Sequence, residues 1–111
     1  MLTFIIQGRY AQEAMRGMVA SPEDRAEAAG TMMANAGGRL AAFYLTFGPY
    51  DFLCVCEAPN EETMAAVQAA VRASGSVIEH MTMLAIPGGR MKDILGRAGE
   101  LGKSFRSAGQ P

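Results

Sequence analysis

Two side chains in this sequence are the best candidates for catalysis, Asp51 and His80. Asp51 follows Gly48-Pro49-Tyr50, where a carboxylate can act as a general base or accept a hydrogen bond from a ligand. Its alternative role is structural, because aspartates at turns often bond nearby backbone groups. His80 is the only histidine, and histidine is the side chain that titrates near neutrality. Its alternation with Ile78 and Thr82 is typical of a packed strand histidine, and the functional alternative is an axial ligand of a heme.

Cys54 and Cys56 are the only thiols. On a strand they share one face, roughly 6 to 7 Å apart, which does not suit a structural disulfide. Two thiolates are half of a typical zinc site, and apolar neighbours such as Phe52 keep thiols protonated. We therefore expect two buried small side chains, no metal site, no cofactor and a reducing, cytoplasmic location.

The apolar pattern predicts four strands and two main helices that position these residues. One helix is expected to start with Ser21 as cap and Pro22 in its first turn, and to stop at Gly37-Gly38. The other is expected to be capped by Asn60 and to end at Ser74-Gly75. The strands are expected at residues 2–9, 39–47, 50–58 and 77–86.

This order, β-α-β-β-α-β, predicts an α+β fold, the ferredoxin-like plait. Right-handed crossovers place both helices on one face of an antiparallel sheet with the spatial strand order 4-1-3-2. The chain length of 111 residues fits one such domain.

The hairpin between the second and third strands is expected to turn at Gly48-Pro49, in a two-residue type II′ turn. The residue numbers of facing partners then add to 97. One face pairs Cys54 with Phe43, Cys56 with Ala41, Phe52 with Leu45 and Tyr50 with Phe47. The other face pairs Asp51 with Thr46, Leu53 with Tyr44, Val55 with Ala42 and Glu57 with Leu40.

Two helices cover only one face of a four-stranded sheet, so apolar residues on the other face have no cover within the chain. Exposed patches of this kind usually mark association sites. We expect a homo-oligomer, a dimer or higher, that forms by sheet-on-sheet packing of the open face.

Polar side chains are expected to gather where the first two strands end and the last two begin. A small-molecule site there would be polar at its mouth and apolar within. Gly48, Tyr50 and Asp51 would shape the mouth, and Tyr44 and Thr46 would supply hydrogen bonds. The expected ligand-binding residues are Gln7, Arg9, Tyr44, Thr46, Gly48, Tyr50 and Asp51.

A change of charge at Pro87-Gly88-Gly89 divides the chain into a domain over residues 1–86 and a C-terminal extension over residues 87–111. The first part carries five arginines against nine acids, a net charge of −4, and the second carries five bases against two acids, +3. Apolar residues at helical spacing predict a helix over about 90–98 that docks on its own or a neighbouring body.

The overall charge of −1 argues against nucleic acid as a partner. No apolar run is long enough for a membrane span, so no membrane partner is expected.

The run from Phe43 to Asp51 closely resembles the signature of the GYD domain family, with Pro49 where that family often has Glu. Similar segments recur in order along residues 1–86: Gly37-Gly38-Arg39-Leu40, Glu57 to Glu62 and Ala73 to Val77. The resemblance implies a fold of the dimeric α/β-barrel type. Its wider superfamily includes cofactor-independent oxygenases, heme-handling enzymes, dehydratases and ligand-sensing domains.

Three functional hypotheses follow. The first is a small oligomeric protein that binds a small molecule between sheets near the Gly48–Asp51 hairpin. The second is a cofactor-independent enzyme in which Asp51 or His80 transfers a proton. The third is a structural assembly unit that docks through its C-terminal segment.

Overall fold

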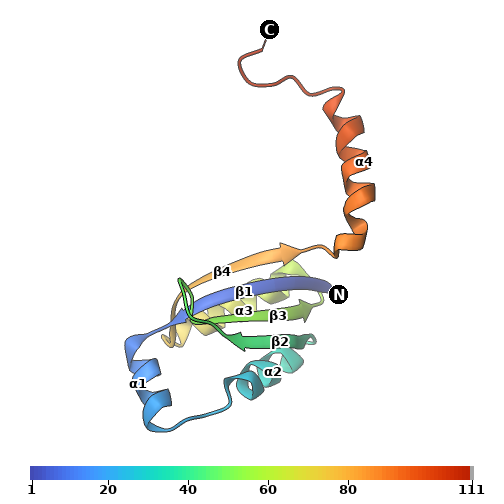
Figure 1. Cartoon of the computed structure of the whole chain (residues 1–111). Helices are drawn as coiled ribbons and strands as arrows, with labels where there is room; N and C mark the ends of the chain where they lie inside the picture. Colours follow the sequence, from blue (N-terminus) through green and yellow to red (C-terminus); the bar gives the residue numbers. More distant parts are fainter. Residues whose placement is uncertain (111) are drawn as a thin grey trace.

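A single antiparallel sheet organises the chain, and the computed structural model describes residues 1–110. The sheet has four strands in the order β2-β3-β1-β4, which confirms the expected topology (Figure 1). The strands are β1 (Leu2–Tyr10), β2 (Arg39–Leu45), β3 (Phe52–Ala58) and β4 (Val77–Ala85).

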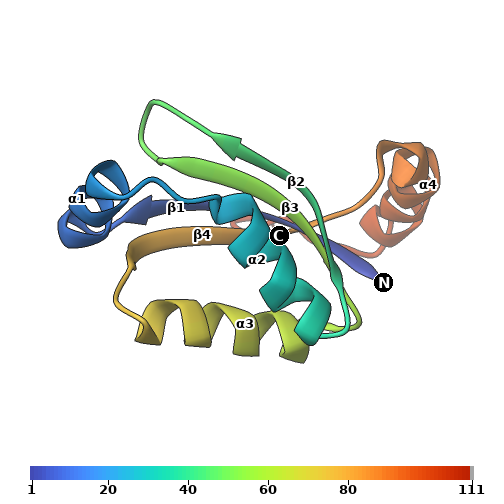
Figure 2. The ribbon, with the colours of Figure 1, turned by 90° about the horizontal axis from the view of Figure 1, so that it is seen from below.

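Two helices, α2 (Arg25–Asn35) and α3 (Glu61–Ala73), lie side by side on the same face of the sheet (Figure 2). Each follows a strand and returns the chain for the next one, as expected for the ferredoxin-like plait. The N-terminus of α3 confirms the expected cap, since the Asn60 Oδ1 accepts a hydrogen bond from the Thr63 N–H at 2.8 Å.

The hydrophobic core lies between this sheet face and the two helices. Met33 of α2 and Met64 of α3 pack against alternate residues of β1 and β3, in agreement with the period-2 pattern of the strands. Gly8 lies beneath the Phe52 ring, which would clash with any Cβ at that position. The buried residues are Phe4, Ile6, Met33, Phe52, Cys54, Cys56, Ala58, Met64 and Val77.

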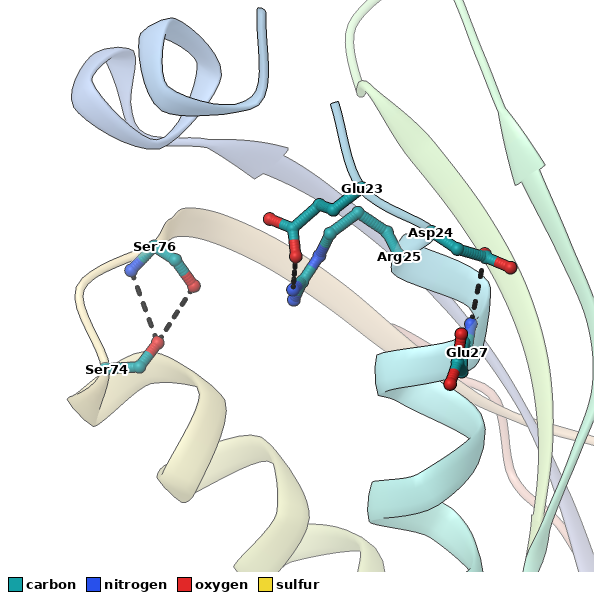
Figure 3. Close-up of polar contacts among 6 residues, drawn as sticks. All are labelled: Glu23, Asp24, Arg25, Glu27, Ser74 and Ser76. Atoms are coloured by element: carbon teal, nitrogen blue, oxygen red, sulfur yellow. Dashed lines mark hydrogen bonds and ion pairs between the residues drawn. The ribbon is translucent and has the colours of Figure 1, made fainter. Parts of the chain in front are cut away.

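The predicted start of α2 was wrong by three residues. Asp24, and not Ser21, caps the helix, with its Oδ1 accepting from the Glu27 N–H at 3.1 Å (Figure 3). Both residue types are good caps, and the chain uses the later one because α1 (Gln12–Ala20) runs up to Ser21.

The predicted two-residue turn at Gly48-Pro49 was also wrong. A type II′ turn needs a positive φ at Gly48, and this glycine is not among the residues with positive φ. The regular strands stop short of the turn, since β2 ends at Leu45 and β3 begins at Phe52, and the backbone hydrogen bond next to the turn runs from the Thr46 N–H to the Asp51 carbonyl. Phe47 therefore does not pair with Tyr50 and is 94 % exposed at the hairpin tip.

The predicted register holds for one half of this hairpin and fails in the other half. Cys54 faces Phe43 and Leu53 faces Tyr44, as expected. An irregularity between Leu40 and Ala42 then shifts the pairing by one residue, so Cys56 faces Leu40 instead of Ala41. The shift turns Leu40 toward the core and brings Arg39, instead of Leu40, opposite Glu57.

The C-terminal helix projects from this body. After a single 3₁₀ turn, Gly88–Arg90, the helix α4 (Met91–Gly102) extends away from the side that carries α2 and α3 (Figure 1). Every residue of α4 is exposed, so this helix does not dock on its own body, and the other alternative, docking on a neighbouring body, stays a prediction. The radius of gyration, 18.1 Å, exceeds the roughly 13 Å of a compact chain of this length.

None of the helices in the described part of the chain, residues 1–110, combines the length and the apolar character that crossing a membrane requires.

Candidate functional site

The sheet face opposite α2 and α3, which we call the open face, has an apolar centre. Two neighbouring rows of facing residues cross it, and the first joins Ala42, Val55, Ile5 and Met83. The next row joins Tyr44, Leu53, Gln7 and Met81. Tyr44 is 58 % exposed and Met83 is 42 % exposed. A contiguous apolar surface of this kind is suited to association.

Charged pairs border this apolar centre at both ends. At one end, Arg39 forms a forked ion pair with Glu57, with both nitrogen–oxygen distances at 3.1 Å. This contact raises the pKa of Arg39 and lowers that of Glu57. At the other end, Arg9 lies 3.4 Å from Glu79. An apolar centre with a polar rim is the usual anatomy of a protein interface.

Asp51, the first catalytic candidate, uses its polar groups within the fold. Its Oδ2 accepts a hydrogen bond from the backbone N–H of Tyr10 at 2.9 Å. Its own N–H donates to Gly8 and its carbonyl accepts from Thr46, at 2.7 and 2.9 Å. These contacts agree with the structural alternative for Asp51, and they join β1 and the β2–β3 hairpin at this end of the sheet.

The remaining ligand-binding candidates divide into two groups. The Thr46 hydroxyl donates to the Tyr50 carbonyl at 2.8 Å, so Thr46 closes the loop itself. Gly48 is exposed at the tip. Gln7 and Tyr44, in contrast, flank Leu53 in one row of the open face. Arg9 lies at the rim of the same face, paired with Glu79.

His80, the second catalytic candidate, faces the opposite side of the sheet. It lines a cavity of about 120 Å³ between the sheet and the helices. Both ring nitrogens are buried, and neither has a hydrogen-bond partner among the described residues. The ring is thus packed on the core side, as expected of a strand histidine, but no hydrogen bond within the described residues satisfies its nitrogens. Within residues 1–110 no carboxylate bonds to the ring, so Asp51 and His80 do not form a catalytic pair.

The cavity has polar lining that sequence reasoning missed. Arg25, the first residue of α2, and Gln68 of α3 join His80 among otherwise largely apolar walls. Arg25 also lines two outer hollows next to α1, as does Tyr10. These two side chains therefore form the partition between the cavity and the surface. The sequence signal that could have indicated Arg25 was the start of α2, because a cap at Asp24 places Arg25 in the first turn of this helix.

Cys54 and Cys56 are buried beneath the helices with their sulfur atoms 3.9 Å apart. The contact with Cys56, together with burial, raises the pKa of Cys54, so this thiol stays protonated. The arrangement agrees with the expected role as small core side chains. Within the described residues, no three His, Cys, Asp or Glu side chains come together as metal ligands would.

Comparison with known proteins identifies the family. The chain matches the family model of the GYD domain over residues 4–95. The chain belongs to the GYD domain family. A curated relative of this chain is 33 % identical over 97 residues, which cover 87 % of this chain and 98 % of the relative. That relative, from Thermus thermophilus, is named "Glutamine synthetase and cystathionine beta-lyase binding protein".

Solved structures add support for the fold. A crystal structure of a Thermus thermophilus protein matches this GYD chain with a TM-score of 0.52 and 21 % identity. The match covers 79 % of this chain and 96 % of that one. At this identity the likeness extends to the fold alone.

Proposed function

We propose that this GYD protein is a protein-binding domain that acts as a homodimer formed through its open face. The observation that carries the proposal is the apolar centre of that face, which no element covers within residues 1–110 and which ion pairs border at both ends. Burying this centre against a second copy removes Leu53, Val55 and Met83 from water, and apolar burial is the main driving force of association. Reduced thiols at Cys54 and Cys56 fit a cytoplasmic location.

The direction of α4 supports a second copy as the occupant. This helix leaves β4 toward the open side of the sheet (Figure 1), with Ile94, Leu95 and Leu101 exposed. The segment after residue 86 carries a net charge of +3, and the body carries −4. Opposite charges favour packing of the α4 of one copy on the body of the other.

A larger protein is the proposed target of this dimer. The curated relative is named as a binding protein of two enzymes, and the present chain offers a separate contact for such a partner. Phe47, at 94 % exposure, has the largest exposed fraction among the large apolar side chains of the described residues. Exposed aromatic residues often dominate the energy of protein interfaces.

Sedimentation velocity of the purified chain tests self-association. We expect a dimer for the parent protein and monomers for Met83→Glu and Tyr44→Glu, because each introduces a carboxylate into the apolar centre. Thr82→Glu is the matched control, since Thr82 is also exposed on β4 but faces the other side. Circular dichroism verifies folding. A parent monomer at all concentrations, or a Thr82→Glu variant that dissociates equally, would contradict the dimer.

Biolayer interferometry with purified enzymes tests the partner. We expect saturable binding of the organism's own glutamine synthetase or cystathionine β-lyase, and at least tenfold weaker binding by Phe47→Ser while the dimer persists. Pro49→Ser, at the same exposed tip, is the control. If neither enzyme binds, the partner assignment is wrong and the dimer is unaffected.

A small-molecule ligand at the hairpin edge of the open face is a second candidate function. It is favoured by Gln7 and Tyr44, which lie on either side of Leu53. Native mass spectrometry of the purified dimer would reveal a retained molecule, and Tyr44→Phe should reduce its occupancy while leaving the dimer intact. An enzyme would instead lose turnover in Asp51→Asn without losing its dimer.

A further inference from the structure

The cavity beneath the helices is separate from the open face and from the hairpin. Its walls are Ile6 and Phe52 of the sheet, with Met33 of α2 and Val67 of α3. At about 120 Å³, it is slightly smaller than the roughly 150 Å³ apolar cavity that holds benzene in an engineered protein. A hydrocarbon body of four or five carbon atoms therefore suits its size.

His80 gives this cavity a polar wall. A neutral imidazole has one donor and one acceptor nitrogen, and both nitrogens here are buried without a partner among the described residues. Leaving such groups unpaired costs free energy. A ligand acceptor directed at the ring N–H of His80 would remove the part of that cost that falls on the donor nitrogen.

The charge around the cavity favours an anion. Arg25 lines it from α2, and its side chain extends toward the turn between α3 and β4 (Figure 3). Its acidic partner Glu23 is 3.4 Å away, and both side chains are partly exposed to solvent. The Arg72 charge acts on His80 from the α3 side. Guanidinium groups bind carboxylates with charge-assisted hydrogen bonds.

We propose that this cavity binds a small apolar monocarboxylate, whose hydrocarbon body fills the apolar part and whose carboxylate accepts hydrogen bonds from Arg25 and His80. Arg25 and Tyr10 form the partition through which the ligand enters. A short acid such as 3-methylbutanoate matches this size, and the site is independent of the dimer and of any protein partner.

The single histidine makes the test direct, because its ring gives one set of ¹⁵N signals. We expect 3-methylbutanoate to shift these signals saturably in the full-length protein. The pKa of His80 should rise on binding, because a carboxylate beside the ring favours its charged form. The other charged or titratable groups that line the cavity are Arg25 of α2, Tyr10 of β1 and Cys54 of β3, and the charge of Arg72 of α3 also acts on the ring.

Variants identify the contacts. Arg25→Gln and His80→Asn should each weaken binding about tenfold or more, as measured by titration calorimetry. Arg16→Gln, an exposed arginine of α1, should bind as the parent does. Amide spectra and melting temperatures verify that each variant is folded.

Three outcomes would overturn the proposal. The first is the absence of a saturable shift with 3-methylbutanoate. The second is equal binding of 3-methylbutanol, which would remove the role of the charge. The third is equal binding of acetate, which would remove the role of the apolar walls.

Discussion

The carboxylate of Asp51 lies 2.9 Å from the backbone nitrogen of Tyr10, and a side chain thereby continues the β1–β3 ladder beyond its last main-chain pair. β3 begins at Phe52, which faces Gly8. Asp51, the residue before β3, bonds β1 twice: its N–H donates to the Gly8 carbonyl, and its carboxylate accepts from the Tyr10 N–H. The acid that resembles a catalytic residue in the sequence is thus part of the sheet.

This contact predicts a stability effect at Asp51. Asp51→Ala should lower the free energy of unfolding by about 1–3 kcal/mol, because it leaves the Tyr10 N–H without its charged acceptor. Asp51→Asn keeps an oxygen acceptor and should lose less. Urea denaturation measures both. A loss in Asp51→Ala no larger than that in Glu79→Gln would show that the hydrogen bond contributes nothing.

Gly8 should tolerate no side chain. Gly8→Ala places a methyl group against the Phe52 ring and should destabilise the protein by about 1–3 kcal/mol through overpacking. The double variant Gly8→Ala/Phe52→Leu should recover part of that loss, and thermal unfolding of the two single variants and the double variant measures the coupling. Strictly additive losses would contradict the contact.

The cap of α2 can be assigned by two alanine variants. Asp24→Ala should cost about 1 kcal/mol, because it removes the acceptor of the Glu27 N–H. Ser21→Ala should leave the free energy of unfolding unchanged, since Ser21 makes no cap of that helix. Chemical denaturation measures both variants, and an equal loss of unfolding free energy in both would contradict the assignment of Asp24 as the cap.

His80 should make stability depend on pH. Burial and the Arg72 charge lower its pKa below the ordinary value, so the unfolded chain takes up this proton at higher pH than the folded chain. Stability is therefore lost as pH falls through about 6.5. The parent should lose more free energy of unfolding between about pH 7.5 and 5.5 than His80→Leu does. An equal loss in the parent and in His80→Leu would show that folding does not lower the pKa of this histidine.

The sequence predicted the strand order and the helix-covered face because hydrophobic period and crossover handedness act over whole elements. The sequence-based prediction failed where a single residue decides the boundary of an element or its register. Two good caps, Ser21 and Asp24, compete at one helix start, and local chemistry does not choose between them. The bulge beside Ala41 lies in the edge strand β2, which pairs only with β3. The end of the hairpin is held by bonds of Asp51 to Gly8 and Tyr10, more than thirty residues away.

The candidate site was predictable only in part. Gln7 and Tyr44 share the open face, as alternation implies, but the roles of Asp51 and Thr46 depend on backbone groups that carry no sequence signal. The cavity beside His80 was missed because it arises from how α2, with Ala28 and Ala29, and α3, with Val67 and Val71, approach the sheet. Spacing along the chain does not specify such a volume.

The exposure of α4 has a consequence for how the molecule behaves on dilution. A solitary helix of 12 residues that contains glycines is only marginally helical in water. Its amide protons should therefore exchange rapidly in isolated copies and become protected once another surface receives its apolar stripe. The order of this segment then depends on protein concentration, and the exchange rate of its amide protons reports the fraction of molecules that are associated.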